Sequence, residues 1–183
     1  NDFLVGYIQG AVDTNPDIKV AVSMVGNYED SAKGKDLSLA MYNAGADIGF
    51  NVAGNAGLGL IEAASETGKL AFGVDSDQAA LLPDYADSIP TSALKNVGDA
   101  LYRAIKLDME GQLAYGTTES LGFADNGVGL VEDAHYEEMV PEEVRTYVAD
   151  LQQQITDGEI TVYTAGEMTT DEIEELKASV AVQ

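Results

Sequence analysis

Two kinds of hydrophobic pattern alternate along the first half of the chain. Short, continuous apolar runs are typical of strands that are covered on both faces. Before and between these runs, apolar residues recur every three or four positions, which predicts helices. The predicted strands are 18–25, 47–53 and 70–74, and the predicted helices are 3–14, a segment after Gly34 that carries Leu37, Ala40, Met41 and Ala44 on one face, and 59–67.

The second half of the chain continues the alternation with longer elements. The pattern predicts a helix over 93–110, strands at 117–124 and 160–164, and a helix that starts at Pro141. Thr169 and Glu172 have the spacing of a capping box, which predicts the start of a last helix. The apolar seam of the helix over 93–110 is Val97, Ala100, Leu101, Ala104 and Ile105, and that of the helix after Pro141 is Val144, Tyr147, Val148, Leu151 and Ile155.

This order of elements indicates an α/β fold with a parallel, doubly wound sheet. In such sheets, ligands bind beyond the carboxyl ends of the strands. The loops after the first three predicted strands offer complementary groups: Tyr28 an aromatic face, Gly54 a close backbone approach, Asn55 an amide and Asp75 two acceptor oxygens. These groups together suit a neutral, flat, hydroxylated ligand such as a sugar or a nucleoside.

Asp75 is the most specific of these candidates. Its carboxylate can accept hydrogen bonds from two vicinal hydroxyls, each worth about 1.5–3 kcal/mol, and it would repel phosphate, which favours a nucleoside over a nucleotide. Each candidate also has a purely structural interpretation. Tyr28 could pack at a rim, the glycines could serve a turn, and Asp75 could cap a helix.

Composition narrows the function further. The chain of 183 residues has 32 acidic and 9 basic residues, and its formal net charge of -23 argues against nucleic-acid partners and anionic membrane surfaces. There is no cysteine, which excludes disulfides and thiolate chemistry. His135 is the only histidine, in an acidic loop where a surface role is expected. No Ser-His-Asp set, His-rich metal cluster or cofactor motif can be assembled, so we expect a binding protein without cofactor or metal and not an enzyme. The acidic runs leave an oxygen-ligand calcium site open, although the EF-hand spacing is absent.

The segments "GYIQGAVDTNPDIKV", "FGVDSDQ", "TSALKNVGDALYRAI" and "NGVGL" resemble the basic membrane protein family, over about residues 3–163. Members are lipoproteins that serve as solute-binding components of ABC transporters and include purine nucleoside receptors. The resemblance implies a type I periplasmic-binding-protein fold, in which two Rossmann-like lobes close on a nucleoside. It implies that Tyr28 stacks on the base, that Gly54 and Asn55 lie beside the ligand, and that Asp75 and Lys95 hold the ribose hydroxyls.

Two departures from the family qualify this expectation. "GNAG" at 54–57 replaces the usual "GGTG", so Asn55 adds a side chain at the site, and most of the first lobe is missing. We therefore expect a C-terminal portion with weak or undetectable nucleoside affinity, whose intact parent is lipid-anchored on the extracellular face of the cell membrane and delivers its ligand to an ABC permease. The expected parts are 1–88 (second-lobe core), 89–116 (hinge and a helix returning to the first lobe), 117–164 (a strand crossing back and further lobe elements) and 165–183 (acidic helix).

Two other functions remain open from sequence. The ligand-sensing domain of a transcription regulator shares this fold, and a nucleoside- or sugar-processing α/β enzyme could use Asp75 as a base. The first would have a basic helix-turn-helix segment in the preceding part of the protein, and the second would release free base from inosine.

Overall fold

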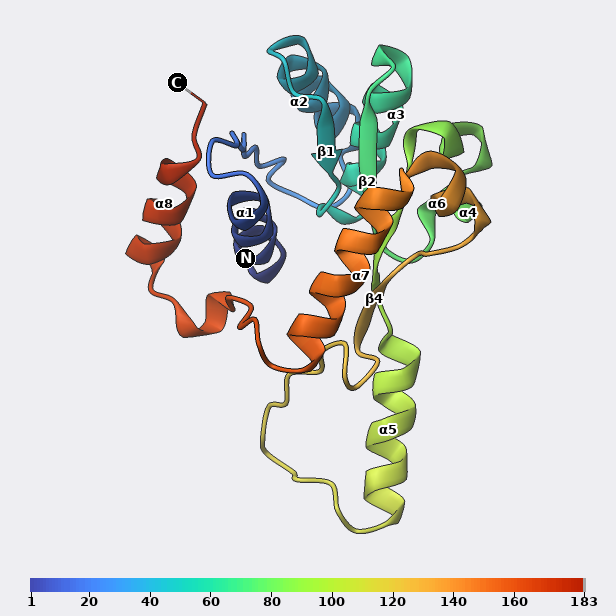
Figure 1. The fold of residues 1–183 in the computed structure, drawn as a ribbon, viewed down its shortest axis with the longest axis vertical. Helices are drawn as coiled ribbons and strands as arrows, with labels where there is room; N and C mark the ends of the chain where they lie inside the picture. Colours follow the sequence, from blue (N-terminus) through green and yellow to red (C-terminus); the bar gives the residue numbers. More distant parts are fainter. Residues whose placement is uncertain (183) are drawn as a thin grey trace.

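The computed structural model describes residues 1–182, and its centre is a four-stranded sheet in the order β1-β2-β3-β4. The first three strands run parallel, with Phe50 beside Phe72 and Asp75 beside Leu94, and β4 runs antiparallel to β3. Helices connect the parallel strands, which confirms the predicted α/β class (Figure 1). The strands are β1 (Ile48–Phe50), β2 (Leu70–Asp75), β3 (Ser92–Lys95) and β4 (Val128–Leu130).

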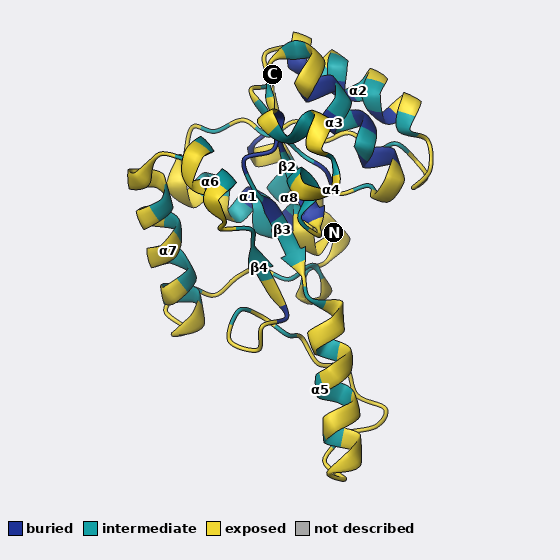
Figure 2. Ribbon diagram, turned by 90° about the vertical axis from the view of Figure 1, so that its right-hand side faces the viewer, coloured by how far each residue is buried: buried dark blue, intermediate teal, exposed yellow. Residues whose placement is uncertain are grey.

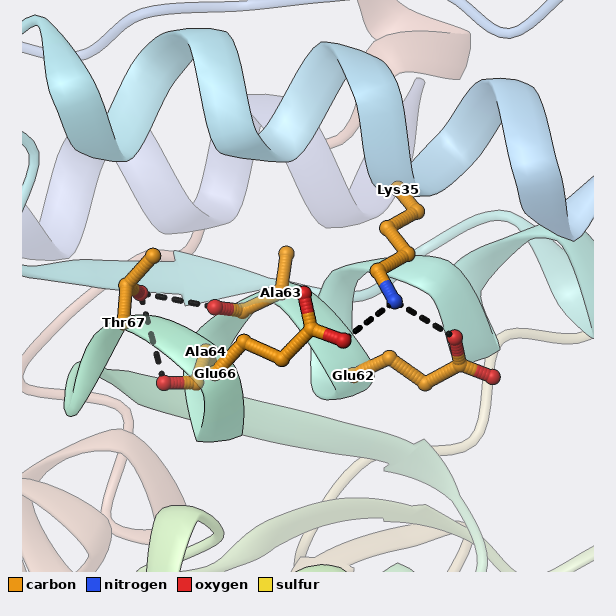
Figure 3. A network of polar contacts seen from close by, with 6 residues as sticks. All are labelled: Lys35, Glu62, Ala63, Ala64, Glu66 and Thr67. Atoms are coloured by element: carbon orange, nitrogen blue, oxygen red, sulfur yellow. Dashed lines mark hydrogen bonds and ion pairs between the residues drawn. The ribbon is translucent and has the colours of Figure 1, made fainter.

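The main core lies between the sheet and two helices, α2 (Ser31–Asn43) and α3 (Leu58–Thr67). Gly59 lets these helices approach closely, because a Cβ there would collide with Ser31 O of α2. Gly34 lets α2 approach the turn before α3, because a Cβ there would collide with Ala56 O. Outside the contact, Lys35 Nζ pairs with Glu62 Oε2 at 3.4 Å and with Glu66 Oε1 at 2.5 Å (Figure 3). The core residues are Tyr42, Ile61, Ala63, Ala64, Ala71 and Ile89.

The face that α2 buries differs from the predicted one. Gly34, Ser38 and Tyr42 are buried, whereas Ala40 and Ala44 of the predicted seam are exposed. Hydrophobicity alone was misleading here because the contact with α3 selects small side chains, and because the Tyr42 hydroxyl is satisfied by donating to Leu70 O at 2.8 Å.

Three of the remaining helices agree with the sequence pattern at an end. Asn15 ends α1, α7 begins directly after Pro141, and the capping box of Thr169 with Glu172 is present at the start of α8. The helices outside the main core are α1 (Asp2–Thr14), α4 (Gln78–Leu81), α5 (Val97–Met109), α6 (Ala134–Met139), α7 (Glu142–Thr156) and α8 (Thr170–Ser179), with short 3₁₀ turns η1 (Gly54–Gly57), η2 (Pro83–Ser88) and η3 (Ala165–Glu167). The sequence pattern predicted neither α4 nor α6.

Three predicted strands, 18–25, 117–124 and 160–164, are wrong: none of them belongs to the sheet among residues 1–182. A strand forms only where a neighbour supplies backbone partners. In 18–25, Val20 N–H donates to Val180 O at 2.9 Å, but no strand pairs with the run. In 160–164, a side chain takes the place of a strand: Gln9 accepts from Tyr163 N at 2.7 Å and donates to Thr161 O at 2.9 Å.

The predicted helix over 93–110 contains two elements. Ser92–Lys95 is strand β3, because β2 and β4 both pair with it, and α5 begins after Asn96. Helix α5 buries none of its residues and projects away from the rest of the molecule (Figures 1 and 2). His135 also differs from expectation, since it is partly buried and its Nε2 lies 3.1 Å from Ala86 O.

Candidate functional site

The carboxyl ends of β1, β2 and β3 lie at one edge of the sheet because the three strands are parallel neighbours. The chain after β1 leads into η1 with Gly54 and Asn55. Strand β2 ends at Asp75 and β3 ends at Lys95. Lys95 therefore extends from the end of a strand and not, as the sequence suggested, from a helix.

Asp75 and Lys95 form an ion pair across the two neighbouring strand ends. Lys95 Nζ lies 2.8 Å from Asp75 Oδ1, and about half of each side chain is exposed (49% for Lys95 and 48% for Asp75). The pair borders a hollow of about 600 Å³ whose lining also includes Ser76, Asn96, Val97 and Asp99. A carboxylate with one oxygen held by an ammonium group keeps acceptor sites for hydroxyl donors from a ligand.

Asp75 has an unusual backbone conformation. Its φ of 67° lies in the left-handed region, which non-glycine residues adopt rarely but which aspartate tolerates better than most. Ser76 N–H donates to Val74 O at 2.8 Å, which closes a three-residue turn around Asp75. The capping role that Asp75 could have had belongs to Asp77, whose Oδ1 accepts from Ala80 N at 3.1 Å and caps α4.

Tyr28, Gly54 and Asn55 form a second group around η1. Tyr28 O accepts from Ala56 N at 2.9 Å, which ties the Tyr28 loop to η1, and the Tyr28 residue is 72% exposed. Gly54 has φ 57°, which explains a glycine there, and its backbone lies against Tyr28. Asn55 Nδ2 donates to Glu29 Oε2 at 3.0 Å. The described residues that line the 600 Å³ hollow include none of these three.

A buried polar network, which the sequence analysis missed, lies beneath this edge. Asn51 is 1% exposed and donates from Nδ2 to Gln78 Oε1 at 3.0 Å. The same oxygen accepts from Val74 N at 3.1 Å, and Gln78 N donates to Ser92 Oγ at 3.1 Å. In the sequence, the only signal of this network is that positions 51 and 92, beside apolar strand segments, are polar.

The surroundings of the hollow are fixed by further polar contacts at the junction of β3 and α5. Asn96 Nδ2 donates to Asn126 O at 3.0 Å, and Asn126 Nδ2 donates to Asp99 Oδ2 at 2.5 Å. Among the described residues there is no group of three or more metal-ligating side chains placed to hold an ion. The arrangement suits an uncharged ligand with several hydroxyl groups.

The family model of PnrA-like ABC transporter substrate-binding proteins matches residues 1–165. Basic membrane protein D of Borreliella burgdorferi is 40% identical over 132 residues, which are 70% of this chain and 38% of that protein. The ABC transporter nucleoside-binding protein BmpA of Lactococcus lactis is 32% identical over 174 residues, with coverage of 87% and 48%. The chain thus spans less than half the length of these two relatives.

Solved structures agree in fold. A solute-binding protein of an ABC transporter system from Aeropyrum pernix superimposes with a TM-score of 0.73 at 27% identity, covering 97% of this chain and 58% of that one. A transcriptional activator of the comK gene from Bacillus halodurans reaches 0.65 at 25% identity, with coverage of 75% and 46%. Within residues 1–182, no helix combines the length and apolarity needed to cross a bilayer.

Proposed function

Because the chain belongs to the family of PnrA-like, or basic membrane protein, ABC transporter substrate-binding proteins, we propose that it carries the ribose-binding half of a nucleoside site. The Asp75–Lys95 pair at the edge of the sheet supports this proposal most directly. In it, Asp75 accepts hydrogen bonds from the vicinal hydroxyls of the ribose, while Lys95, paired with Asp75 Oδ1, donates to a ribose oxygen.

The other predicted residues have roles in the same proposal. The exposed ring of Tyr28 is free to stack on a nucleobase, and the backbone at Gly54 lets a flat ligand approach closely. Asn55 contributes less than its amide suggests, because one of its N–H groups already donates to Glu29. A ligand that bridges both groups would lie along the edge formed by the ends of β1, β2 and β3. A purine nucleoside has the two chemical halves, a flat base and a hydroxylated ribose, that these two groups would bind.

We also infer that this chain is the C-terminal portion of a longer, two-lobed protein. The short coverage of its relatives and the exposed seam of α5 both support this inference, since Leu101 is 60% and Ile105 is 61% exposed. Burial of each such side chain is worth about 1.5–3 kcal/mol, so a second lobe against α5 would stabilise the pair. The 89–116 segment then links the lobes, and ligand contacts with both lobes favour the closed state.

In the intact protein, we propose that binding serves import. The closed receptor, lipid-anchored outside the cell membrane, would deliver the nucleoside to an ABC permease. The chain catalyses no reaction in this proposal, because the family to which it belongs consists of substrate-binding proteins of ABC transporters. Incubation with inosine should therefore release no free base. The structural likeness to a transcriptional activator leaves ligand sensing as the second candidate, and a basic helix-turn-helix segment preceding residue 1 would favour it.

Ligand titrations followed by NMR test the ribose contact. We expect inosine to bind this chain weakly, with saturable shifts at Asp75, Ser76 and Lys95, because half of the site is supplied by another lobe. The analogue 2′,3′-dideoxyinosine should leave these resonances unchanged because it lacks the hydroxyls that Asp75 accepts from. Absence of inosine shifts, or equal shifts with both ligands, would contradict the proposal. Tight binding of inosine to this chain, measured by calorimetry, would contradict the proposal that the chain carries only half of the nucleoside site.

Two variants of the same loop provide a matched control. Asp75→Asn removes the charged acceptor and should abolish the inosine shifts. Asp77→Asn changes an aspartate two residues away that caps α4, and asparagine caps a helix about as well. We expect Asp77→Asn to bind as the unmodified chain does.

A further inference from the structure

Strand β2 extends beyond the end of β1, and this leaves a gap in the sheet next to Asp75. The last contact of β1 with β2 is Asn51 N–H donating to Phe72 O at 3.2 Å. In a parallel pair, residues two apart on a strand direct their backbone groups to the same neighbour. Val74 therefore points its N–H toward the position that β1 has already left, whereas Gly73 N–H points the other way, to Thr91 O at 3.0 Å.

The side chain of Gln78 fills this gap. Its Oε1 accepts from Val74 N at 3.1 Å, in place of the missing strand carbonyl, and also from Asn51 Nδ2 at 3.0 Å, at the end of β1. Its backbone N–H donates to Ser92 Oγ at 3.1 Å, on β3. One residue thus connects the carboxyl ends of β1 and β2 with the first residue of β3.

The space around the network is closely filled. A Cβ on Gly57 would collide with the side chain of Asn51, and a Cβ on Gly73 would collide with Ser92 Oγ. Asn51 and Ser92 are each 1% exposed. Such packing leaves these side chains few alternative positions, so the oxygen of Gln78 is held where Val74 needs it.

Val74 is also one end of the strained turn at Asp75. Its carbonyl accepts from Ser76 N–H, and its N–H is held by Gln78, so both polar groups of the residue preceding Asp75 are fixed. A left-handed conformation at a non-glycine residue persists only when its surroundings hold it. The direction in which the Asp75 carboxylate points toward Lys95 therefore depends on Gln78.

We propose that Gln78 is a positioning residue that holds the Asp75 turn and thereby sets the preference for a ligand with vicinal hydroxyls. This proposal rests on the nucleoside-binding function proposed above. It assigns Gln78 no contact with the ligand. A substitution at Gln78 should therefore weaken only the contacts that Asp75 makes with the ligand.

The first test needs no ligand. Gln78→Met keeps the length of the side chain but removes both acceptor contacts, so amide hydrogen exchange at Val74 should become about tenfold faster or more, the equivalent of one lost hydrogen bond. Exchange at Gly73, whose N–H donates to Thr91 O directly before β3, should stay the same and thus reports that the fold is intact. Gln78→Glu keeps an acceptor oxygen and should restore slow exchange at Val74. Unchanged exchange at Val74 in Gln78→Met would overturn the proposal.

The second test uses ligand. In Gln78→Met we expect inosine affinity to fall by about tenfold to a hundredfold, as for a hydrogen bond to a charged group. Any residual affinity for 2′,3′-dideoxyinosine should stay at the level of the unmodified chain. Equal losses for both ligands, or faster Val74 exchange without loss of inosine affinity, would mean that Gln78 is merely structural. If the unmodified chain shows no inosine shifts, the proposed function fails, while the exchange measurement still decides whether Gln78 holds the turn.

Discussion

Helices α3 and α5 differ in what their apolar side chains contact. In α3, Ile61, Ala63 and Ala64 are fully buried against α2 and the sheet. In α5, the seam is at least as regular in sequence, yet Leu101 and Ile105 are 60% and 61% exposed. Figure 2 shows the contrast as a dark interior around α3 and an exposed, projecting α5.

This difference shows that an amphipathic pattern specifies which side of a helix needs a partner but not where the partner is. For α3 the partner is close in sequence, because α2 and β2 flank it on either side. For α5 no described element covers the seam, and we have proposed that a second lobe does. The core formed by α2 and α3 and the exposed helix α5 should therefore respond differently to the same kind of substitution.

The largest effect should come from shortening a core side chain. Ile61→Ala on α3 should lower the free energy of unfolding by about 2–5 kcal/mol, because a buried isoleucine leaves a cavity. Ile105→Ala on α5 should change it by less than about 0.5 kcal/mol, as is usual for exposed positions. Urea denaturation followed by circular dichroism measures both. Similar losses in the two variants would mean that α5 is covered in solution, for instance by a second copy of the chain.

A glycine-to-alanine substitution should change the free energy of unfolding in opposite directions in the two regions. Gly34→Ala should destabilise the fold by about 1–3 kcal/mol, because the added methyl collides with Ala56 O in the contact between α2 and η1. Gly98→Ala in the first turn of α5 meets no atom and should stabilise by up to about 1 kcal/mol. Thermal denaturation of the two variants gives the comparison. Stabilisation by Gly34→Ala would disprove the close backbone contact of α2.

The smallest of the three effects concerns pH. Burial, with a contribution from nearby Tyr7, raises the pKa of Tyr42 to about 12. The unfolded chain loses this proton near pH 10 and the folded chain only near 12, so the free energy of unfolding should fall by about 1–2 kcal/mol as pH rises between these values.

Tyr42→Phe should make that fall smaller, because the titrating hydroxyl is gone. Tyr102→Phe on α5, where the tyrosine is 70% exposed, is the control and should leave the pH dependence as it is. Urea denaturation at a series of pH values gives the two profiles. Identical profiles for the two variants would show that Tyr42 does not titrate as a buried group.

Elements with local partners were predictable from sequence. Helices α1 and α3 and strand β2 were found close to their observed bounds, because their patterns agree with the contacts that they make. The run 18–25 has an equally strong strand pattern, but no strand pairs with it in the described structure. Conversely, the pattern predicts a helix from residue 93, whereas Ser92–Lys95 is a strand because it pairs with β2 and β4.

The residues of the candidate site likewise differ in whether the sequence alone predicts them. Asp75 could be found from sequence alone, since an aspartate that follows a buried strand lies at the ligand-binding edge of a parallel sheet. Lys95 came from the resemblance to a family, and the ion pair with Asp75 gives it a physical basis. Gln78 could not be found, because its role depends on β2 continuing past the end of β1.

The sequence by itself determined the class of fold, most helix boundaries and the acidic residue at the edge of the sheet, because hydrophobic periodicity and capping act over a few neighbouring positions. Only the tertiary structure decided which apolar runs became strands, which face of α2 was buried and which side chain supports Asp75. These features depend on hydrogen-bond partners and packing contacts that are distant in the chain, and no local pattern encodes where such partners come together.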